Sequence, residues 1–105
     1  MDIAWTKGHL GIAYIGLNDP EKARSLLEDA IQVYRKNLGE NKIGFAWVSL
    51  HLGHAYTRLG LYDQARPLLQ KAAEAHNKLY GENHHFSKEA QEYLRENEVA
   101  EKSSQ

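Results

Sequence analysis

The hexapeptide HLGIAY at residues 9–14 returns almost unchanged as HLGHAY at residues 51–56, at an offset of 42 residues (51 minus 9). When residues 3–44 are laid over residues 45–86, many other positions agree, including the two tryptophans of the chain. A fixed period in this range is typical of solenoid proteins, in which each repeat buries its apolar face against the next one. The repetition therefore predicts two copies of one structural unit.

The apolar residues within each unit recur at helical spacing. Two such stripes follow one another in the second unit, from Leu52 to Leu59 and from Ala65 to Ala73. Gly60, between them, suits the left-handed backbone that often ends a helix, and in the first unit either Asn18 or Asp19 can cap the second helix. Each unit is predicted to be a helix, a tight turn and a second helix. The expected helices lie near residues 3–17, 20–37, 45–59, 62–79 and 86–98.

Small residues recur at fixed places in the two units. Gly11 pairs with Gly53, and the alanine pairs are Ala23 with Ala65 and Ala30 with Ala72. We expect these residues where two helix axes approach closely, because a larger side chain would push the helices apart. The other interpretation of the glycines, a phosphate-binding loop, requires a strand-to-helix turn that the sequence does not predict.

These residues resemble the tetratricopeptide repeat. The matching positions are Leu10, Gly11, Tyr14, Ala23, Leu27 and Ala30, and then Leu52, Gly53, Tyr56, Gly60, Tyr62, Ala65, Leu69 and Ala72. The usual repeat has about 34 residues, and the longer unit here, with YGENH at 80–84, is similar to the variety found in kinesin light chains and many bacterial arrays. The first unit departs from that variety at Lys42, where a histidine is expected. The resemblance implies an all-α, right-handed α-solenoid, a single domain over residues 1–98 with repeats at 3–44 and 45–86 and a capping helix at 86–98.

The last segment departs from the repeat pattern. Arg95 stands where the two units have a close-packing glycine, and the dipeptide Asn97–Glu98 replaces an alanine–tyrosine pair. We therefore expect the helix at 86–98 to be a solvated cap and residues 99–105 to be a polar tail, disordered from residue 101. The first unit has no such polar cap, and about three repeats are usually needed for stability. The chain is thus expected either to self-associate through its first repeat or to belong to a longer array.

In this family the first helices of successive units line a concave groove that commonly binds partners. The resemblance implies a largely apolar and aromatic groove formed by Trp5, Gly8, Ile12, Ile15, Gly16, Trp47, Leu50, His54, Thr57 and Arg58. Tryptophan and arginine are frequent interface anchors, and exposed apolar grooves mark binding sites. Alternatively, the tryptophans pack between neighbouring helices, and Arg58 is a solvated side chain paired with Asp63.

Some members of the family grip the acidic C-terminal peptide of a chaperone with lysine, arginine and asparagine side chains on three first helices. Here Gly8, Ile12 and His54 stand at the matching positions, and the third unit is incomplete. We therefore expect no such clamp. The expected partner is a protein or peptide with an apolar or amphipathic segment, bound as a short helix or an extended strand.

The composition excludes several classes of function. Lysine and arginine number 13 against 14 aspartates and glutamates, and no basic stripe is present, so no nucleic-acid partner is expected. No stretch approaches the roughly 20 apolar residues of a membrane span, and no apolar run of secretory type opens the chain, so we expect a cytoplasmic location and no membrane partner. The absence of cysteine removes thiolate nucleophiles and zinc–thiolate sites.

Six histidines raise the question of metal binding or catalysis. His51 and His54 share a side of one helix and His9 lies one unit away, but no acidic residue falls on that stripe, so we expect surface histidines and no metal site. The serines lack a nucleophile elbow or a nearby base, so we expect no catalytic residue, no cofactor and no enzyme activity. The predicted function is a protein–protein interaction module, a scaffold or adaptor. A self-assembling structural element is the alternative.

Overall fold

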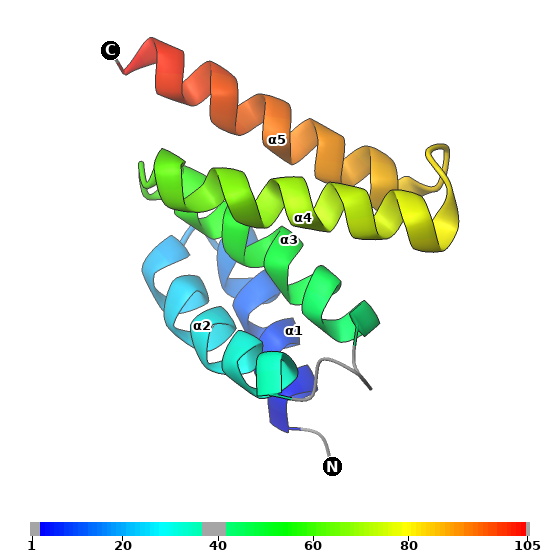
Figure 1. Cartoon of the computed structure of the whole chain (residues 1–105). Coiled ribbons are helices and arrows are strands. Elements are labelled where there is room, and N and C mark those ends of the chain that lie inside the picture. Colours follow the sequence, from blue (N-terminus) through cyan, green and yellow to red (C-terminus); the bar gives the residue numbers. More distant parts are fainter. Residues whose placement is uncertain (1–2, 37–41, 105) are drawn as a thin grey trace.

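The computed structural model describes residues 3–36 and 42–104, and within them the chain forms five helices. These are α1 (Ile3–Gly16), α2 (Pro20–Lys36), α3 (Lys42–Arg58), α4 (Tyr62–Tyr80) and α5 (His85–Ser103) (Figure 1). Every predicted helix is present, with ends within three residues of the prediction except at the C-terminal end of α5. The predicted all-α fold is confirmed. The glycine expected to end α2, in LGEN at 38–41, lies outside the described residues.

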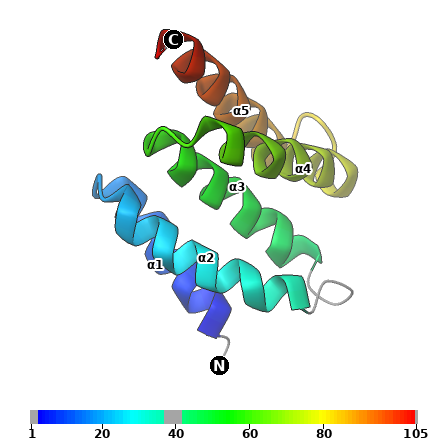
Figure 2. The ribbon, with the colours of Figure 1, turned by 60° about the vertical axis from the view of Figure 1, so that its left-hand side comes forward.

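Helices that follow one another in the chain pack against each other, so α1 pairs with α2 and α3 pairs with α4. The central helix α3 also contacts α1 and α5, which brings the three odd-numbered helices together (Figures 1 and 2). Helix α5 lies along α4 (Figure 1). The arrangement is that of two helix-turn-helix units followed by one further helix.

The backbone of the two short turns explains where the first helix of each unit stops. Asn18 has a φ of 63° and Gly60 a φ of 79°, both in the left-handed region that asparagine and glycine tolerate best. Asp19 Oδ1 accepts a hydrogen bond from the Lys22 N–H at 3.3 Å, so Asp19 rather than Asn18 caps α2. Pro20 then takes the first helical position, where no amide hydrogen bond is needed.

The paired glycines hold the two helices of each unit close together. A Cβ added to Gly11 would lie 2.6 Å from Leu27 Cγ, and one added to Gly53 would lie 2.6 Å from Leu69 Cγ. Both leucines are fully buried. The same contact therefore recurs in both units, and the packing interpretation of these glycines is confirmed.

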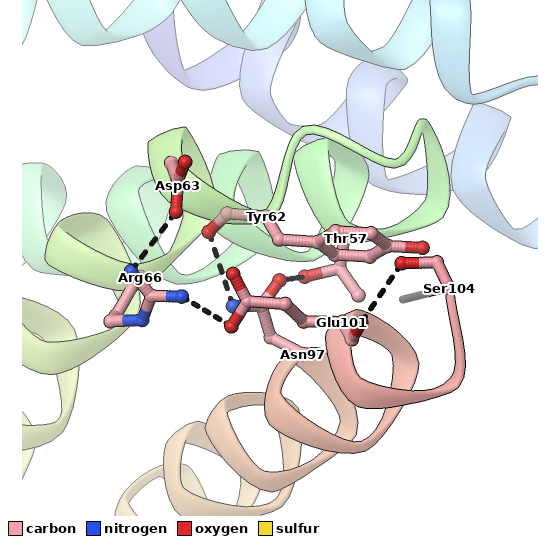
Figure 3. Close-up of polar contacts among 7 residues, drawn as sticks. All are labelled: Thr57, Tyr62, Asp63, Arg66, Asn97, Glu101 and Ser104. Carbon is pink, nitrogen blue, oxygen red and sulfur yellow. Dashed lines mark hydrogen bonds and ion pairs between the residues drawn. The ribbon is translucent and has the colours of Figure 1, made fainter.

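The C-terminal helix corrects one prediction. Helix α5 continues to Ser103, so the part of the expected disordered tail from residue 101 to residue 103 is helical. Glu101 accepts a hydrogen bond from Arg66 of α4, which also pairs with Asp63 at 3.2 Å (Figure 3). The Ser104 hydroxyl donates to the Glu101 carbonyl at 2.9 Å at the end of the helix (Figure 3).

Asn97 forms hydrogen bonds between α5 and the second unit and does not face solvent. Its side chain is fully buried. The sequence predicted a solvated cap here, because asparagine replaces the alanine of the two repeats. The Thr57 hydroxyl donates to Asn97 Oδ1 at 2.8 Å, and Asn97 Nδ2 donates to the Tyr62 carbonyl at 3.2 Å (Figure 3). Buried side-chain amides in folded proteins have hydrogen-bond partners, and here both Oδ1 and Nδ2 of Asn97 have one.

Candidate functional site

A continuous row of rings crosses the odd-numbered helices. The ring of Trp5 lies 4.2 Å from that of His9, which lies 4.8 Å from that of Trp47 on α3. The row continues from Trp47 to His51 at 6.3 Å and from His51 to Tyr93 of α5 at 6.3 Å. His54 stacks on Tyr93 at 3.9 Å between centroids. We call this set the ring row, and its members are Trp5, His9, Trp47, His51, His54 and Tyr93.

The 42-residue repeat generates this row. Positions that are 42 apart fall at the same place on neighbouring odd-numbered helices, so His9, His51 and Tyr93 follow one another across the three helices. A Cβ added to Gly8 would lie 2.7 Å from Trp47 Cζ3, so the missing side chain of Gly8 lets the Trp47 ring lie against α1. Trp47 thus packs between helices and remains partly exposed, which combines the two alternatives considered for it.

The structure divides the predicted groove residues into two sets. The first set is exposed or half-buried and consists of Trp5, Ile12, Ile15, Gly16, Trp47, His54 and Arg58. Gly8, Leu50 and Thr57 are buried and present no side chain at the surface, so they are removed from the predicted binding surface. A binding role for the first set stays a prediction.

The helical spacing explains why these residues were misplaced. In the second half of α3 and at Trp47, one side of the helix holds the half-buried Trp47, His51 and His54 and the exposed Arg58, whereas the buried Leu50 and Thr57 stand one position earlier than His51 and Arg58. One residue turns the helix by about 100°, which is enough to move a side chain into the core. Leu50 is 0% exposed, and the Thr57 hydroxyl is 3.1 Å from the Gly53 carbonyl in addition to its bond with Asn97.

Sequence reasoning missed His9, His51, Tyr93 and Glu96 as members or neighbours of this surface. Tyr93 and Glu96 stand 42 residues after His51 and His54, so extending the repeat offset into α5 would have found them. Glu96 Oε1 lies 3.5 Å from His54 Nε2. No acidic residue of α1 or α3 falls on the histidine stripe, as predicted, but α5 brings the Glu96 carboxylate against it.

Burial keeps the central histidines of the row neutral near pH 7. It is the largest cause that lowers the pKa of His51 from 6.5 to about 4, and charge on His54, His76 and His9 lowers it further. Burial also lowers the pKa of His54, and the Glu96 carboxylate opposes that shift. At the α5 end, burial and the carboxylates of Glu89, Glu96 and Glu92 raise the pKa of Tyr93 to about 12.

Arg58 is not paired with Asp63. Its guanidinium donates to Asn18 Oδ1 at 2.9 Å, which ties the turn of the first unit to the end of α3. Asp63 is paired with Arg66 instead, at 3.2 Å. Arg58 is exposed beyond this contact, at the C-terminal end of α3.

A separate cavity of about 790 Å³ lies between α3 and α4, lined by residues that include Phe45, Ser49, Lys71 and Asn77. Over residues 3–36 and 42–104, no group of three or more histidine, cysteine, aspartate or glutamate side chains is arranged to hold a metal ion. None of the five helices described above is both long enough and apolar enough to cross a bilayer.

Comparison with protein families divides the chain as the structure does. A family model described as tetratricopeptide repeat matches residues 3–41, which include α1 and α2, and a second model of the same description matches residues 44–94, from α3 into α5. The comparison with curated proteins found no match. The helix-turn-helix units, their repeated glycine–leucine contacts and these matches agree, and the chain belongs to the tetratricopeptide repeat family.

Proposed function

We propose that this chain is a protein–protein interaction module, a scaffold or adaptor that binds a segment of its partner across the ring row. Tetratricopeptide repeat domains generally bind protein partners. The observation that carries the proposal is the continuity of the ring row over three helices, with Trp5 55% exposed at its α1 end. Aromatic side chains that are rigid and partly exposed are the usual anchors of an interface.

The surface beside the ring row favours an apolar or amphipathic segment. Ile12 and Ile15 add half-buried aliphatic area on α1, and Arg58 supplies a positive charge at one end. The role is binding rather than catalysis, with no cofactor.

We also assign the chain to the long variety of the repeat, and the lengths of α2 and α4, 17 and 19 residues, support this assignment.

A peptide-display selection tests this function. Peptides selected on the native chain from a random library are titrated against the native chain, Trp5→Ala and a control, Leu79→Ser, by fluorescence polarisation. Leu79 is 46% exposed on α4 and lies outside the ring row, so the control also removes exposed apolar area. We expect Trp5→Ala to bind about tenfold more weakly or worse, as for loss of an interface anchor. Equal affinities in all three chains, or a selection that yields no binder, would contradict the proposal.

A specific difference between the two units favours a second candidate function, self-association through α1. Leu52 is 2% exposed in the second unit, where α2 packs against α3, but its counterpart Leu10 is 47% exposed on α1. Ala13 is likewise exposed, whereas its counterpart Ala55 is fully buried. The outer face of α1 therefore suits a helix that resembles α2, from a second copy or from preceding repeats of a longer array.

Sedimentation velocity over a range of protein concentrations tests this second candidate. Self-association predicts a sedimentation coefficient that rises with concentration for the native chain and for the control Leu79→Glu, but not for Leu10→Glu. A monomer at every concentration for all three chains would eliminate pairing between copies.

A further inference from the structure

We propose that the partner segment carries a basic side chain, arginine or lysine, at the α5 end of the ring row and an apolar portion at the α1 end. This inference rests on the proposed function, because it names the chemistry of the segment that the same surface binds. It follows from an uneven distribution of charge along the ring row. Comparing residues that stand 42 positions apart on α1, α3 and α5 reveals this distribution.

Nine exposed or half-buried positions on the ring-row side of the three odd-numbered helices correspond at the 42-residue offset. On α1 these positions hold Trp5, His9 and Ile12; on α3 they hold Trp47, His51 and His54; on α5 they hold Glu89, Tyr93 and Glu96. The α1 set has no acidic residue, and the α5 set has two. Along the ring row from α1 to α5, the surface thus changes from aromatic and aliphatic to acidic.

The carboxylates at the α5 end are close to the rings. Glu96 Oε1 is 3.5 Å from His54 Nε2, and the Glu96 side chain is 43% exposed. Tyr93 is hydrogen-bonded to Glu89. The charges of Glu89, Glu96 and Glu92 all act on the Tyr93 hydroxyl, and burial raises the pKa of Glu89 itself, so negative charge is concentrated where solvent is partly excluded. A cation brought to this point would relieve that unfavourable concentration.

Arg58, Lys88 and Arg95 are the basic residues to consider near this end. The Arg58 guanidinium is hydrogen-bonded to Asn18 Oδ1, and its charge acts on His54, where the Glu96 carboxylate acts in the opposite sense. Lys88 and Arg95 are exposed on α5, and each stands two residues from a fully buried residue of the same helix, Ala90 and Asn97 respectively. Two residues correspond to about 200° of rotation, so Lys88 and Arg95 point away from the buried side of α5, and the charges that act on the Tyr93 hydroxyl are those of Glu89, Glu96 and Glu92.

An arginine side chain fits this combination of groups best. Its planar guanidinium can stack on an aromatic ring and donate charge-assisted hydrogen bonds to a carboxylate at the same time. The apolar part of the segment would then cover Trp5 and Ile12, where no charge has to be desolvated. An acidic segment, in contrast, would meet like charge at Glu89 and Glu96.

Two synthetic peptides test the inference. Each has about twelve residues, which span about 40 Å when extended, enough to cross the 31 Å middle dimension of the molecule. One peptide combines leucine and alanine in its first half with three arginines in its second half, and the other has glutamate in place of arginine. Binding is measured by fluorescence polarisation at low and high salt, with the native chain, the double variant Glu89→Gln/Glu96→Gln and the control Glu82→Gln/Glu98→Gln. The control removes the same charge from exposed positions outside the ring row.

The inference predicts that the arginine peptide binds the native chain and the control about tenfold more tightly than the glutamate peptide does at low salt, and that salt or the double variant removes most of this preference. Equal or tighter binding of the glutamate peptide, or an unchanged preference in the double variant, would overturn it. So would the absence of binding by both peptides. The proposed function stands apart from each of these outcomes, because it depends on whether display-selected peptides of any charge require Trp5.

Discussion

His51 makes the stability of the fold sensitive to acid. Its pKa in the folded chain is about 4 instead of 6.5, first because the ring is buried and then because of charge on neighbouring histidines. Between these two values the unfolded chain binds a proton that the folded chain does not bind. The free energy of unfolding therefore falls as the pH falls, and the contribution of neutral His51 is complete only above about pH 6.5.

The size of this effect follows from the two pKa values. Each unit of difference corresponds to about 1.36 kcal/mol, so the full loss is about 3 kcal/mol when the pH reaches about 4. At pH 5 the unfolded ring is almost fully protonated and the folded ring almost fully neutral, which gives a loss of about 2 kcal/mol. For a chain of this size, about 2 kcal/mol is a large part of the total stability.

Urea unfolding followed by circular dichroism at pH 7 and pH 5 measures this loss. The native chain is expected to lose about 2 kcal/mol more than His51→Gln between the two pH values, since the variant has no titrating ring at this position. His85→Gln, which replaces an exposed histidine outside the ring row, serves as the matched control and is expected to lose as much as the native chain. Equal losses in the native chain and His51→Gln would refute the reasoning.

Three further changes test the packing. Asn97→Leu removes both side-chain hydrogen bonds of a fully buried residue and is expected to lower the free energy of unfolding by about 1–3 kcal/mol in urea; a change below about 0.5 kcal/mol would mean that these bonds do not hold α5. Gly53→Val places a side chain against Leu69 and is expected to cost about 1–3 kcal/mol, whereas Gly16→Val, in open space, is expected to cost less. Gly60→Ala forces alanine to a φ of 79° and is expected to lower the melting temperature, with a cost of about 1 kcal/mol; an unchanged melting temperature would contradict the left-handed turn.

The helix-turn-helix units were predictable because their causes are local or periodic. Apolar spacing indicated the helices, and the recurrence of Gly11 as Gly53 indicated where the helices of each unit meet. The structure shows the physical reason for that recurrence, since each glycine faces a buried leucine at the same distance.

The binding surface was less predictable because it depends on small rotations of the helices. Placing Leu50 rather than His51 in the binding groove is an error of one position, and the rotation of α3 about its own axis decides which of the two is buried. The α5 contacts were missed for another reason. Asn97 and Glu101 find their partners 35 to 40 residues earlier in the chain, and no local pattern distinguishes such a buried polar contact from a solvated helix surface.

The most direct test of the central proposal is a ¹⁵N–¹H spectrum of the native chain titrated with a display-selected peptide. The chain has two tryptophans, so the spectrum contains two indole N–H signals, from Trp5 and Trp47, and both belong to the ring row. Binding across the ring row predicts that both indole signals and the backbone amides of Tyr93 and Glu96 shift together, while the amide of Leu79 stays in place. Shifts confined to residues around the cavity between α3 and α4, with both indole signals unmoved, would contradict the proposal.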